Sequence, residues 1–117
     1  MNTNSETGQV GERAAVDWLR REGFLIMERN WRYGRYELDI IALKDECIRF
    51  VEVKTRSVTG WTSPESAIDR SKRNSMIRAA MAYRRLHPSH RNFGFDLAAV
   101  DLMPDGSCEV RYIRGII

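Results

Sequence analysis

The sequence predicts an α/β fold in which one mixed β-sheet is flanked by two main helices. Its length of 117 residues suits one hydrophobic core and is too short for two, so we expect a single domain over residues 1–117. The composition, 43% hydrophobic and 30% charged, is typical of globular chains. The periodicity of apolar residues changes along the chain in the order helix, three strands, helix, two strands. This order favours a sheet with helices packed against it.

The first element is a predicted helix over residues 10–22. Its apolar side chains recur at the spacing of one helical face, and Gly23 is a typical C-terminal stop. The polar residues 1–8 before it have no apolar pattern, and we expect them to be flexible.

Three extended segments follow and are predicted to pair as an antiparallel meander. Each is apolar and is bounded by glycine or by a short polar run, which is typical of strands joined by tight turns. The predicted strands span 24–31, 36–43 and 47–55, and the predicted turns span 32–35 and 44–46.

The second half of the chain is predicted to contain a loop, a long helix and a hairpin. The loop over 57–64 contains Trp61, which no core pattern explains, and which either stacks on a nucleic-acid base or folds over the loop. Helical spacing continues over 65–86. Two further strands, at 93–102 and 108–113, close the fold as a hairpin.

Charged side chains interrupt the apolar face of the third predicted strand. Because side chains alternate in an extended strand, Glu52 and Lys54 continue the face that begins with Ile48 and Phe50. Burying this end of the strand would be costly unless the charges pair with each other or with a metal ion. The strand therefore combines a core pattern with a candidate site.

A carboxylate interrupts the preceding strand in the same way. Asp39 shares a predicted face with Ile41 and can converge with Glu52 if the two strands are hairpin neighbours. Two carboxylates, with the carbonyl of Val53 as a further oxygen, suit Mg²⁺ or Mn²⁺. Lys54 would orient an attacking water or neutralise charge on a scissile phosphate. The pattern predicts a phosphodiester-cleaving site, and a structural salt bridge at Glu52 is the alternative.

Three other charges also interrupt apolar patterns. Glu12 and Lys72 lie on apolar helix faces, from which both can point into the same cleft. Alternatively, Glu12 adds negative charge to a helix N-terminal turn and Lys72 snorkels to the surface. Asp96 interrupts an apolar strand without a lysine two residues later, so we predict a structural hydrogen bond or ion pair there.

The charge balance permits a nucleic-acid partner. Lys and Arg number 19 against 16 Asp and Glu, which gives a net charge of +3, and the basic residues crowd into the second half of the chain. We expect contacts with nucleic acid at Arg56, Lys72, Arg73 and Trp61.

The cysteines and the hydropathy suggest where the protein resides. Cys47 and Cys108 form no CxxC pair, so neither a zinc site nor a disulfide scaffold is predicted and a reducing compartment fits best. No apolar run approaches the length that spans a bilayer. We therefore expect a cytoplasmic protein with no membrane partner.

Several blocks of the sequence, taken in order, resemble those of a known family. The blocks span 8–12, 29–30, 37–42, 50–56, 67–72, 79–80 and 95–96. They resemble the PD-(D/E)xK nuclease superfamily and, more closely, the YraN-like family of small bacterial proteins, which is similar to archaeal Holliday junction resolvases. Several ordered blocks are far more specific than the short charged triplet at Glu52 to Lys54.

The resemblance implies a restriction-endonuclease-like sheet and divalent-metal-dependent cleavage of DNA. It implies catalytic positions at Glu12, Asp39, Glu52 and Lys54, with Mg²⁺ or Mn²⁺ held by Glu12, Asp39, Glu52 and Val53. Branched DNA and repair intermediates are the candidate substrates, and a homodimer is a candidate assembly because branched DNA presents paired scissile sites. The alternative is a non-catalytic nucleic-acid-binding or adaptor domain that retains the fold.

Overall fold

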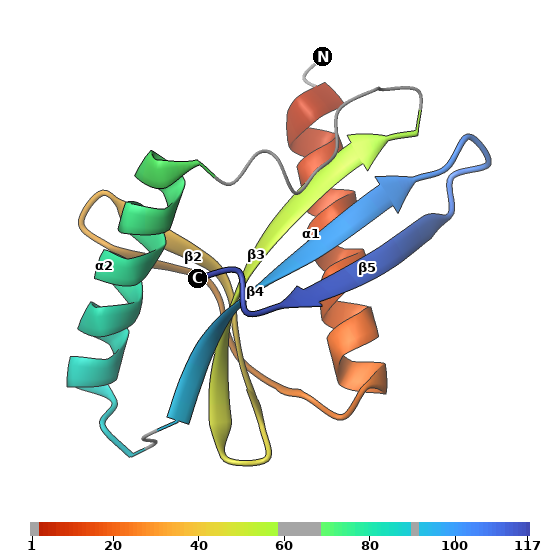
Figure 1. Cartoon of the computed structure of the whole chain (residues 1–117). Coiled ribbons are helices and arrows are strands. Elements are labelled where there is room, and N and C mark those ends of the chain that lie inside the picture. The colour runs from red at the N-terminus through yellow and green to blue at the C-terminus, as the bar shows by residue number, and fades with distance from the viewer. Residues whose placement is uncertain (1–2, 59–68, 90–91) are drawn as a thin grey trace.

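The protein is a five-stranded mixed sheet with two helices packed against it, which confirms the predicted fold class (Figure 1). The computed structural model describes residues 3–58, 69–89 and 92–117. Along the chain the elements are α1 (Thr3–Arg21), β1 (Leu25–Tyr33), β2 (Tyr36–Lys44), β3 (Cys47–Ser57), α2 (Arg70–Leu86), β4 (Asn92–Leu102) and β5 (Cys108–Arg114).

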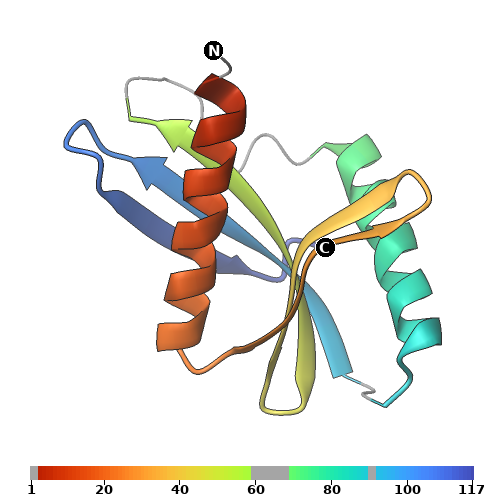
Figure 2. The same cartoon turned by 180° about the vertical axis from the view of Figure 1, so that it is seen from behind.

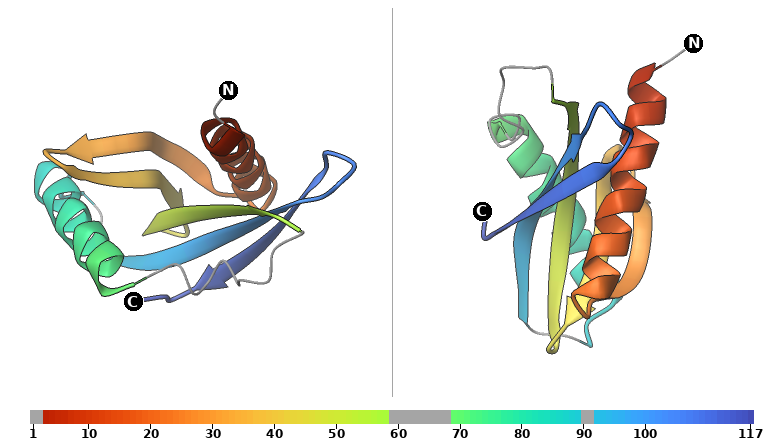
Figure 3. Two further views of the ribbon diagram at one scale, coloured as in Figure 1. Left: turned by 90° about the horizontal axis from the view of Figure 1, so that it is seen from above. Right: turned by 90° about the vertical axis from the view of Figure 1, so that its right-hand side faces the viewer.

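The strands lie in the sheet in their order along the chain, β1-β2-β3-β4-β5. β1, β2 and β3 form the predicted antiparallel meander, and β4 pairs with β5 as the predicted hairpin. β3 and β4 are parallel over their whole length, because α2 carries the chain back to the starting end of the sheet. In the side view of Figure 3, the sheet lies between α1 and α2.

Two hydrophobic cores lie on opposite faces of the sheet. The core beneath α2 contains Leu38, Ile41, Ile48, Phe50, Met76, Ala79, Ala80, Tyr83 and Phe95. The core beneath α1 contains Ala15, Val16, Leu19, Ile40, Ala42, Val51, Ala98 and Val100. The alternation predicted for β3 is therefore confirmed, since Ile48 and Phe50 face α2 while Val51 faces α1.

Both helices differ from their predicted bounds. α1 begins at Thr3 rather than at residue 10, so residues 3–8, which were expected to be flexible, belong to the helix. The apolar pattern did not predict these first two turns because they are polar. α2 begins at Arg70, since Asp69 has an extended backbone and its side chain accepts a hydrogen bond from the Lys72 amide at 2.8 Å. Residues 65–68, which were predicted to be helical, lie outside the described residues, as does Trp61. Neither helix in the described ranges combines the length and apolar character needed to cross a membrane.

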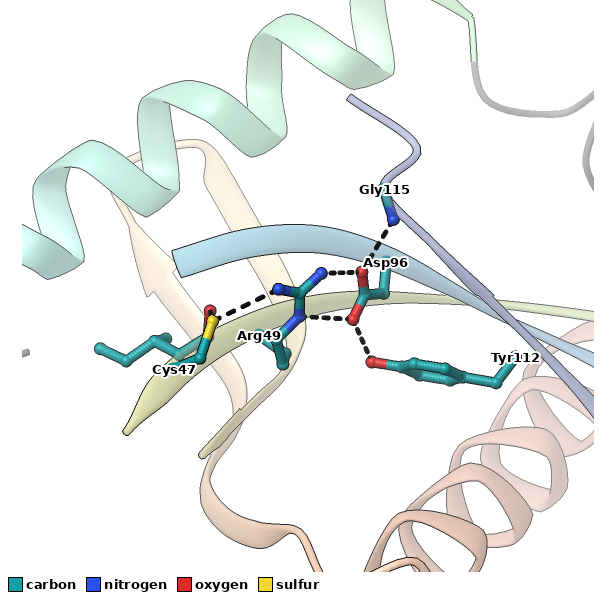
Figure 4. Close-up of polar contacts among 6 residues, drawn as sticks. Cys47, Arg49, Asp96, Tyr112 and Gly115 are labelled. Carbon is teal, nitrogen blue, oxygen red and sulfur yellow. Dashed lines mark hydrogen bonds and ion pairs between the residues drawn. The ribbon is translucent and has the colours of Figure 1, made fainter. Parts of the chain in front are cut away.

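A buried ion pair joins β3 to β4 (Figure 4). Asp96 is 0% exposed and receives two hydrogen bonds from Arg49, of which that from Nε is 2.7 Å long. The hydroxyl of Tyr112 and the amide of Gly115 also donate to this carboxylate, the latter at 3.0 Å. Another guanidinium nitrogen of Arg49 lies 3.3 Å from the sulfur of Cys47. The predicted structural role of Asp96 is thus confirmed.

Candidate active site

The candidate site lies where β2 separates from β3. Their pairing ends at Ile40↔Val51, whereas β3 stays paired with β4 to its last residue. Figure 2 shows the hairpin of β1 and β2 leaving β3 and reaching toward α2. Asp39 is the first residue of β2 beyond the pairing, and its Oδ2 accepts a hydrogen bond from the amide of Val53 at 2.8 Å. The carboxylate thus replaces the missing strand partner at this point.

The predicted alternation of β2 is wrong at the same place. Leu38 and Ile41 both pack in the core beneath α2, although they are three residues apart. Ile40 packs beneath α1. Asp39 therefore does not simply share the face of Ile41, because the strand twists where it loses its neighbour β3.

Glu52 is buried at the end of the apolar stripe on β3. It is 2% exposed, and its Oε2 lies 3.0 Å from Lys72 Nζ and 3.6 Å from Lys54 Nζ. Its other oxygen, Oε1, is buried and has no hydrogen-bond partner. A buried carboxylate oxygen without a partner is unfavourable in a folded protein, so it indicates a place for a cation or a donor.

The pKa values of Asp39 and Lys72 are both raised in this site. Burial, followed by the charge of Glu52, raises the pKa of Asp39 from its ordinary value to about 7. Burial is the largest single cause acting on the pKa of Lys72 and lowers it, but the charge and hydrogen bond of Glu52, together with the charges of Asp39 and Glu37, outweigh it and the pKa is raised. Both shifts show a partly buried cluster in which Glu52 disfavours ionised Asp39 and favours charged Lys72.

Glu12 extends from α1 into a cleft that Asp39 lines and Glu52 does not. Its Oε1 accepts hydrogen bonds from Arg29 Nη2 at 3.0 Å and from Asn30 Nδ2 at 3.0 Å. Glu12 and Asp39 line a cleft of about 750 Å³ together with Val53. Since α1 begins at Thr3, Glu12 lies in the middle of the helix, and its alternative interpretation as an N-terminal charge is wrong.

Arg29 and Asn30 are site residues whose role the sequence analysis missed. Asn30 adopts a left-handed backbone at φ 53°, a conformation that Asn tolerates better than most residues. The bend at this position lets two consecutive side chains of β1 reach one oxygen of Glu12. The adjacent Arg29-Asn30 pair was a signal, but only the tertiary contact gives it this role.

Close packing of α1 on β3 fixes the position of Glu12. A Cβ atom at Gly11 would lie 1.7 Å from Thr55 Oγ1 and 2.7 Å from Thr55 Cβ. Only glycine allows this approach, and it brings the next residue, Glu12, over the end of the sheet.

We expect Gly11→Ala to lower the free energy of unfolding by about 1–3 kcal/mol, because the added methyl overpacks the contact with Thr55. Urea unfolding measures this change. The matched control is Gly8→Ala on the same helix, where an added Cβ meets nothing within 4 Å. The control should be neutral or stabilising by up to about 1 kcal/mol. Equal losses in the two variants would contradict the packing argument.

The residues predicted to contact nucleic acid lie on different elements of the fold. Arg56 donates to Asp101 on β4 at 2.9 Å, so its side chain is held in a surface ion pair and is not part of the Glu52 cluster. Arg73 is exposed on α2. Lys72 forms an ion pair with Glu52, and its contact with nucleic acid stays a prediction.

The donor set fits a hard divalent cation. Mg²⁺ is commonly held by one or two carboxylates, with water and substrate phosphate completing its coordination. Asp39 and Glu52 supply two carboxylates, and a cation would satisfy Glu52 Oε1 and favour ionised Asp39. Within the described ranges no three Asp, Glu, His or Cys side chains gather closely enough to hold a metal on their own. A metal at this site would therefore depend on backbone, water or phosphate oxygens as well.

Comparison with known proteins places the sequence among uncharacterised bacterial relatives. The family described as "Uncharacterised protein family UPF0102" matches residues 11–100. A UPF0102 protein of Bacteroides thetaiotaomicron is 41% identical over 114 residues, which cover 97% of this chain and 93% of that protein. A UPF0102 protein of Beutenbergia cavernae is 38% identical over 117 residues, which cover 99% of both. The matched region includes Glu12, Asp39 and the whole of β3.

Proposed function

This chain belongs to the uncharacterised protein family UPF0102, and we propose that it is a divalent-metal-dependent endonuclease that hydrolyses phosphodiester bonds in DNA. The observation that carries the proposal is the pair Asp39 and Glu52 at the parting of two strands. One carboxyl of this pair has a pKa raised to about 7, and the other has a buried oxygen without a partner. A buried carboxyl with a raised pKa that lines an open cleft, as Asp39 does, is typical of functional sites.

The side chains of the cluster have distinct roles in this proposal. Asp39 and Glu52 would hold Mg²⁺ or Mn²⁺, with the carbonyl of Val53 as a further ligand. A bound divalent ion supplies Lewis acidity toward the scissile phosphate. Lys54 lies 3.6 Å from Glu52 and orients the attacking water or neutralises charge that develops on the phosphate oxygens. Lys72, which lies on α2, holds Glu52 in place through their ion pair.

Glu12 would act from α1, within the cleft that Asp39 also lines. Arg29 and Asn30 hold its Oε1, so the orientation of this carboxylate is set before any substrate binds. In this position it can bind a water or a ligand of the metal. Preorganisation of this kind lowers the cost of ordering the site during the reaction.

We further propose a cytoplasmic enzyme that acts on branched DNA as a homodimer. Cys47 and Cys108 are both free thiols, which supports a reducing compartment. A two-fold symmetric pair would present two sites to a branched substrate. Gel filtration with light scattering, in the presence and absence of a four-way junction, tests the assembly.

One observation favours the alternative, a non-catalytic nucleic-acid-binding domain. The nearer lysine, Lys72, lies 3.0 Å from Glu52, so the cluster already contains a positive charge that partly neutralises the carboxylates. In a non-catalytic adaptor domain, the cluster would serve only to form this structural ion pair between Lys72 and Glu52. Such a domain would bind DNA in a salt-sensitive manner, would take up no metal, and would cleave no substrate.

Metal uptake separates the two functions, and its pH dependence follows from Asp39. The folded pKa of about 7 lies above the ordinary value, so between about pH 4 and pH 7 the folded state holds a proton that the unfolded state releases. The metal-free fold therefore loses stability as pH rises through this window, and a cation must displace the proton below pH 7.

We expect Mn²⁺ at about one hundred times its dissociation constant to raise Tm by roughly 10 °C at pH 8. At pH 5.5 the same concentration should raise Tm by no more than a few degrees, because apparent affinity falls up to about tenfold per pH unit below the pKa. Differential scanning calorimetry and isothermal titration calorimetry measure the two effects. No heat of Mn²⁺ binding at pH 8 would overturn the metal-dependent proposal and leave the adaptor.

A further inference from the structure

A second groove lies between α2 and the tip of the β1–β2 hairpin, and we propose that it binds single-stranded DNA. The proposal rests on the proposed nuclease function and deepens it, since it names the form of DNA that is led to the site. The groove has two adjoining parts of about 520 Å³ and about 510 Å³. The residues that carry the proposal are Tyr33, Tyr36, Arg35, Arg70, Arg78 and Arg85.

The α2 side of the groove is one stripe of the helix. Arg70, Asn74, Arg78 and Arg85 are separated by four, four and seven residues, a spacing that places them on one face. The buried residues of the helix, such as Tyr83, lie on another face and pack on the sheet. The arginine stripe is therefore not needed for the core, and Arg70, Arg78 and Arg85 are all exposed.

The groove is positively charged. None of the residues that line its two parts is acidic. Within the part of the chain that the structure describes, Arg70, Arg78 and Arg85 form no ion pair with a carboxylate. Arg35 donates a hydrogen bond to the Tyr36 hydroxyl at 3.2 Å, and this bond, together with the charges of Arg35 and Arg78, lowers the pKa of Tyr36. Such a groove suits the phosphates of a nucleic-acid backbone.

The hairpin side of the groove supplies an aromatic platform. Tyr33 is 45% exposed and stacks on Trp31, with ring centroids 6.3 Å apart and planes 7° apart. Trp31 is in turn held edge-on against the buried ring of Tyr83 at 5.2 Å. The guanidinium of Arg85 lies 6.0 Å from the centre of the Tyr33 ring. An exposed ring on a rigid support, beside arginines, is the arrangement on which unpaired bases stack.

This aromatic platform favours a single strand over a duplex. Bases in a duplex are already stacked on their neighbours, so their faces are not available to Tyr33. The groove is built on two elements that also carry residues of the candidate active site. Tyr36 precedes Asp39 by three residues on β2, and Arg70 precedes Lys72 by two residues on α2, although the residues that line the groove do not line the cleft at Asp39. In this proposal a strand held in the groove continues along these two elements to the carboxylate pair.

Fluorescence anisotropy with a labelled 15-nucleotide oligo-dT, in EDTA, tests the charge of the groove. We expect the double variant Arg78→Ala/Arg85→Ala to bind roughly tenfold more weakly, and the slope of log K against log salt to fall by about 1.4 for two lost phosphate contacts. The matched control is Arg20→Ala/Arg21→Ala at the exposed C-terminal end of α1, which removes the same charge. Equal losses in the two double variants would overturn the proposal, since binding would then follow net charge alone.

The aromatic contact has its own test. Tyr33→Ala should weaken oligo-dT binding roughly tenfold, while Tyr33→Phe should bind as the parent does, because only the ring is needed. Tyr33 is 45% exposed and stacks on Trp31, so thermal unfolding of each variant sets a temperature at which all are folded, and binding is compared there. Duplex binding as tight as single-strand binding would also overturn the proposal.

The test separates failure of the groove from failure of the nuclease proposal. Asp39→Asn should retain full oligo-dT binding, because Asp39 does not line the groove. If the groove variants bind normally while cleavage still requires Asp39, the groove assignment is wrong and the nuclease proposal stands. If they lose binding but no variant or parent cleaves DNA, the groove stands and the nuclease proposal fails.

Discussion

Replacing Asp39 with asparagine is expected to slow metal-dependent cleavage of a four-way DNA junction by at least about a thousandfold, which corresponds to about 4 kcal/mol of lost transition-state stabilisation. The amide keeps the size of the side chain, and its oxygen can still accept the hydrogen bond from Val53. What it loses is the negative charge that attracts a divalent cation. Single-turnover cleavage in Mg²⁺ and in Mn²⁺ measures the effect.

The same variant should not unfold the protein. Asp39 is disfavoured in its ionised form, as its pKa of about 7 shows, so a neutral side chain removes repulsion with Glu52. We expect the metal-free variant to be more stable than the parent at pH 8, by an amount on the order of 1 kcal/mol. Activity and stability would then change in opposite directions, which is typical of functional residues.

Asp45→Asn is the matched control for Asp39→Asn. Asp45 is exposed in the hairpin between β2 and β3, and its φ of 53° is a conformation that asparagine also adopts. This control removes the same charge and should cleave at the parental rate. Cleavage that persists in Asp39→Asn, with Mn²⁺ uptake unchanged, would rule out the carboxylate pair as the catalytic centre.

Replacing Asp96 with alanine is expected to lower the free energy of unfolding by about 3–5 kcal/mol, because it leaves the guanidinium of Arg49 buried without its counter-charge. Tyr112 and the amide of Gly115 would lose their acceptor as well. The guanidinium of Arg49 packs directly over Gly94 of β4, where an added Cβ atom would meet it. Urea unfolding, followed by circular dichroism, measures the loss.

Asp101→Ala provides the control on the same strand. Asp101 also forms ion pairs with arginines, Arg56 at 2.9 Å and Arg111 at 3.5 Å, but its side chain is 14% exposed and all three side chains reach the surface. We expect a loss of about 1 kcal/mol or less, since a pair that reaches solvent is worth little. Losses of equal size in the two variants would show that burial does not set the strength of the Asp96 network.

Much of the candidate site was predictable from local pattern. The alternation along β3 placed Glu52 at the end of an apolar stripe, and the structure finds it 2% exposed there. The polar connection at 44–46 predicted that β2 and β3 are hairpin neighbours, and they are. Asp96 was separated from the site because no lysine follows it, and it forms the buried pair with Arg49. In each case the signal lies within about ten residues of the chain.

Other features of the site depend on contacts between distant parts of the chain. Lys72 was interpreted either as a site residue or as a snorkelling one, and only the packing of α2 on the sheet brings its Nζ to 3.0 Å from Glu52. Glu12 was predicted to point into a cleft, and it lines one, but its hydrogen-bond partners Arg29 and Asn30 were not predicted. The ion pair of Arg56 with Asp101 was not predicted either, and the contact of Arg56 with nucleic acid stays a prediction.

The sequence by itself determined the type and order of the elements and the two faces of β3, because apolar periodicity is a property of the local chain. The tertiary structure alone decided where β2 leaves β3, and hence that Asp39 bonds to Val53 in place of a strand partner. It also decided which of the exposed arginines of α2 face the hairpin. The physical reason is that the local sequence around a carboxylate, a lysine or an aromatic ring is the same whether or not a distant part of the chain supplies an interaction partner. Their chemistry is set by the distance and burial that only packing provides.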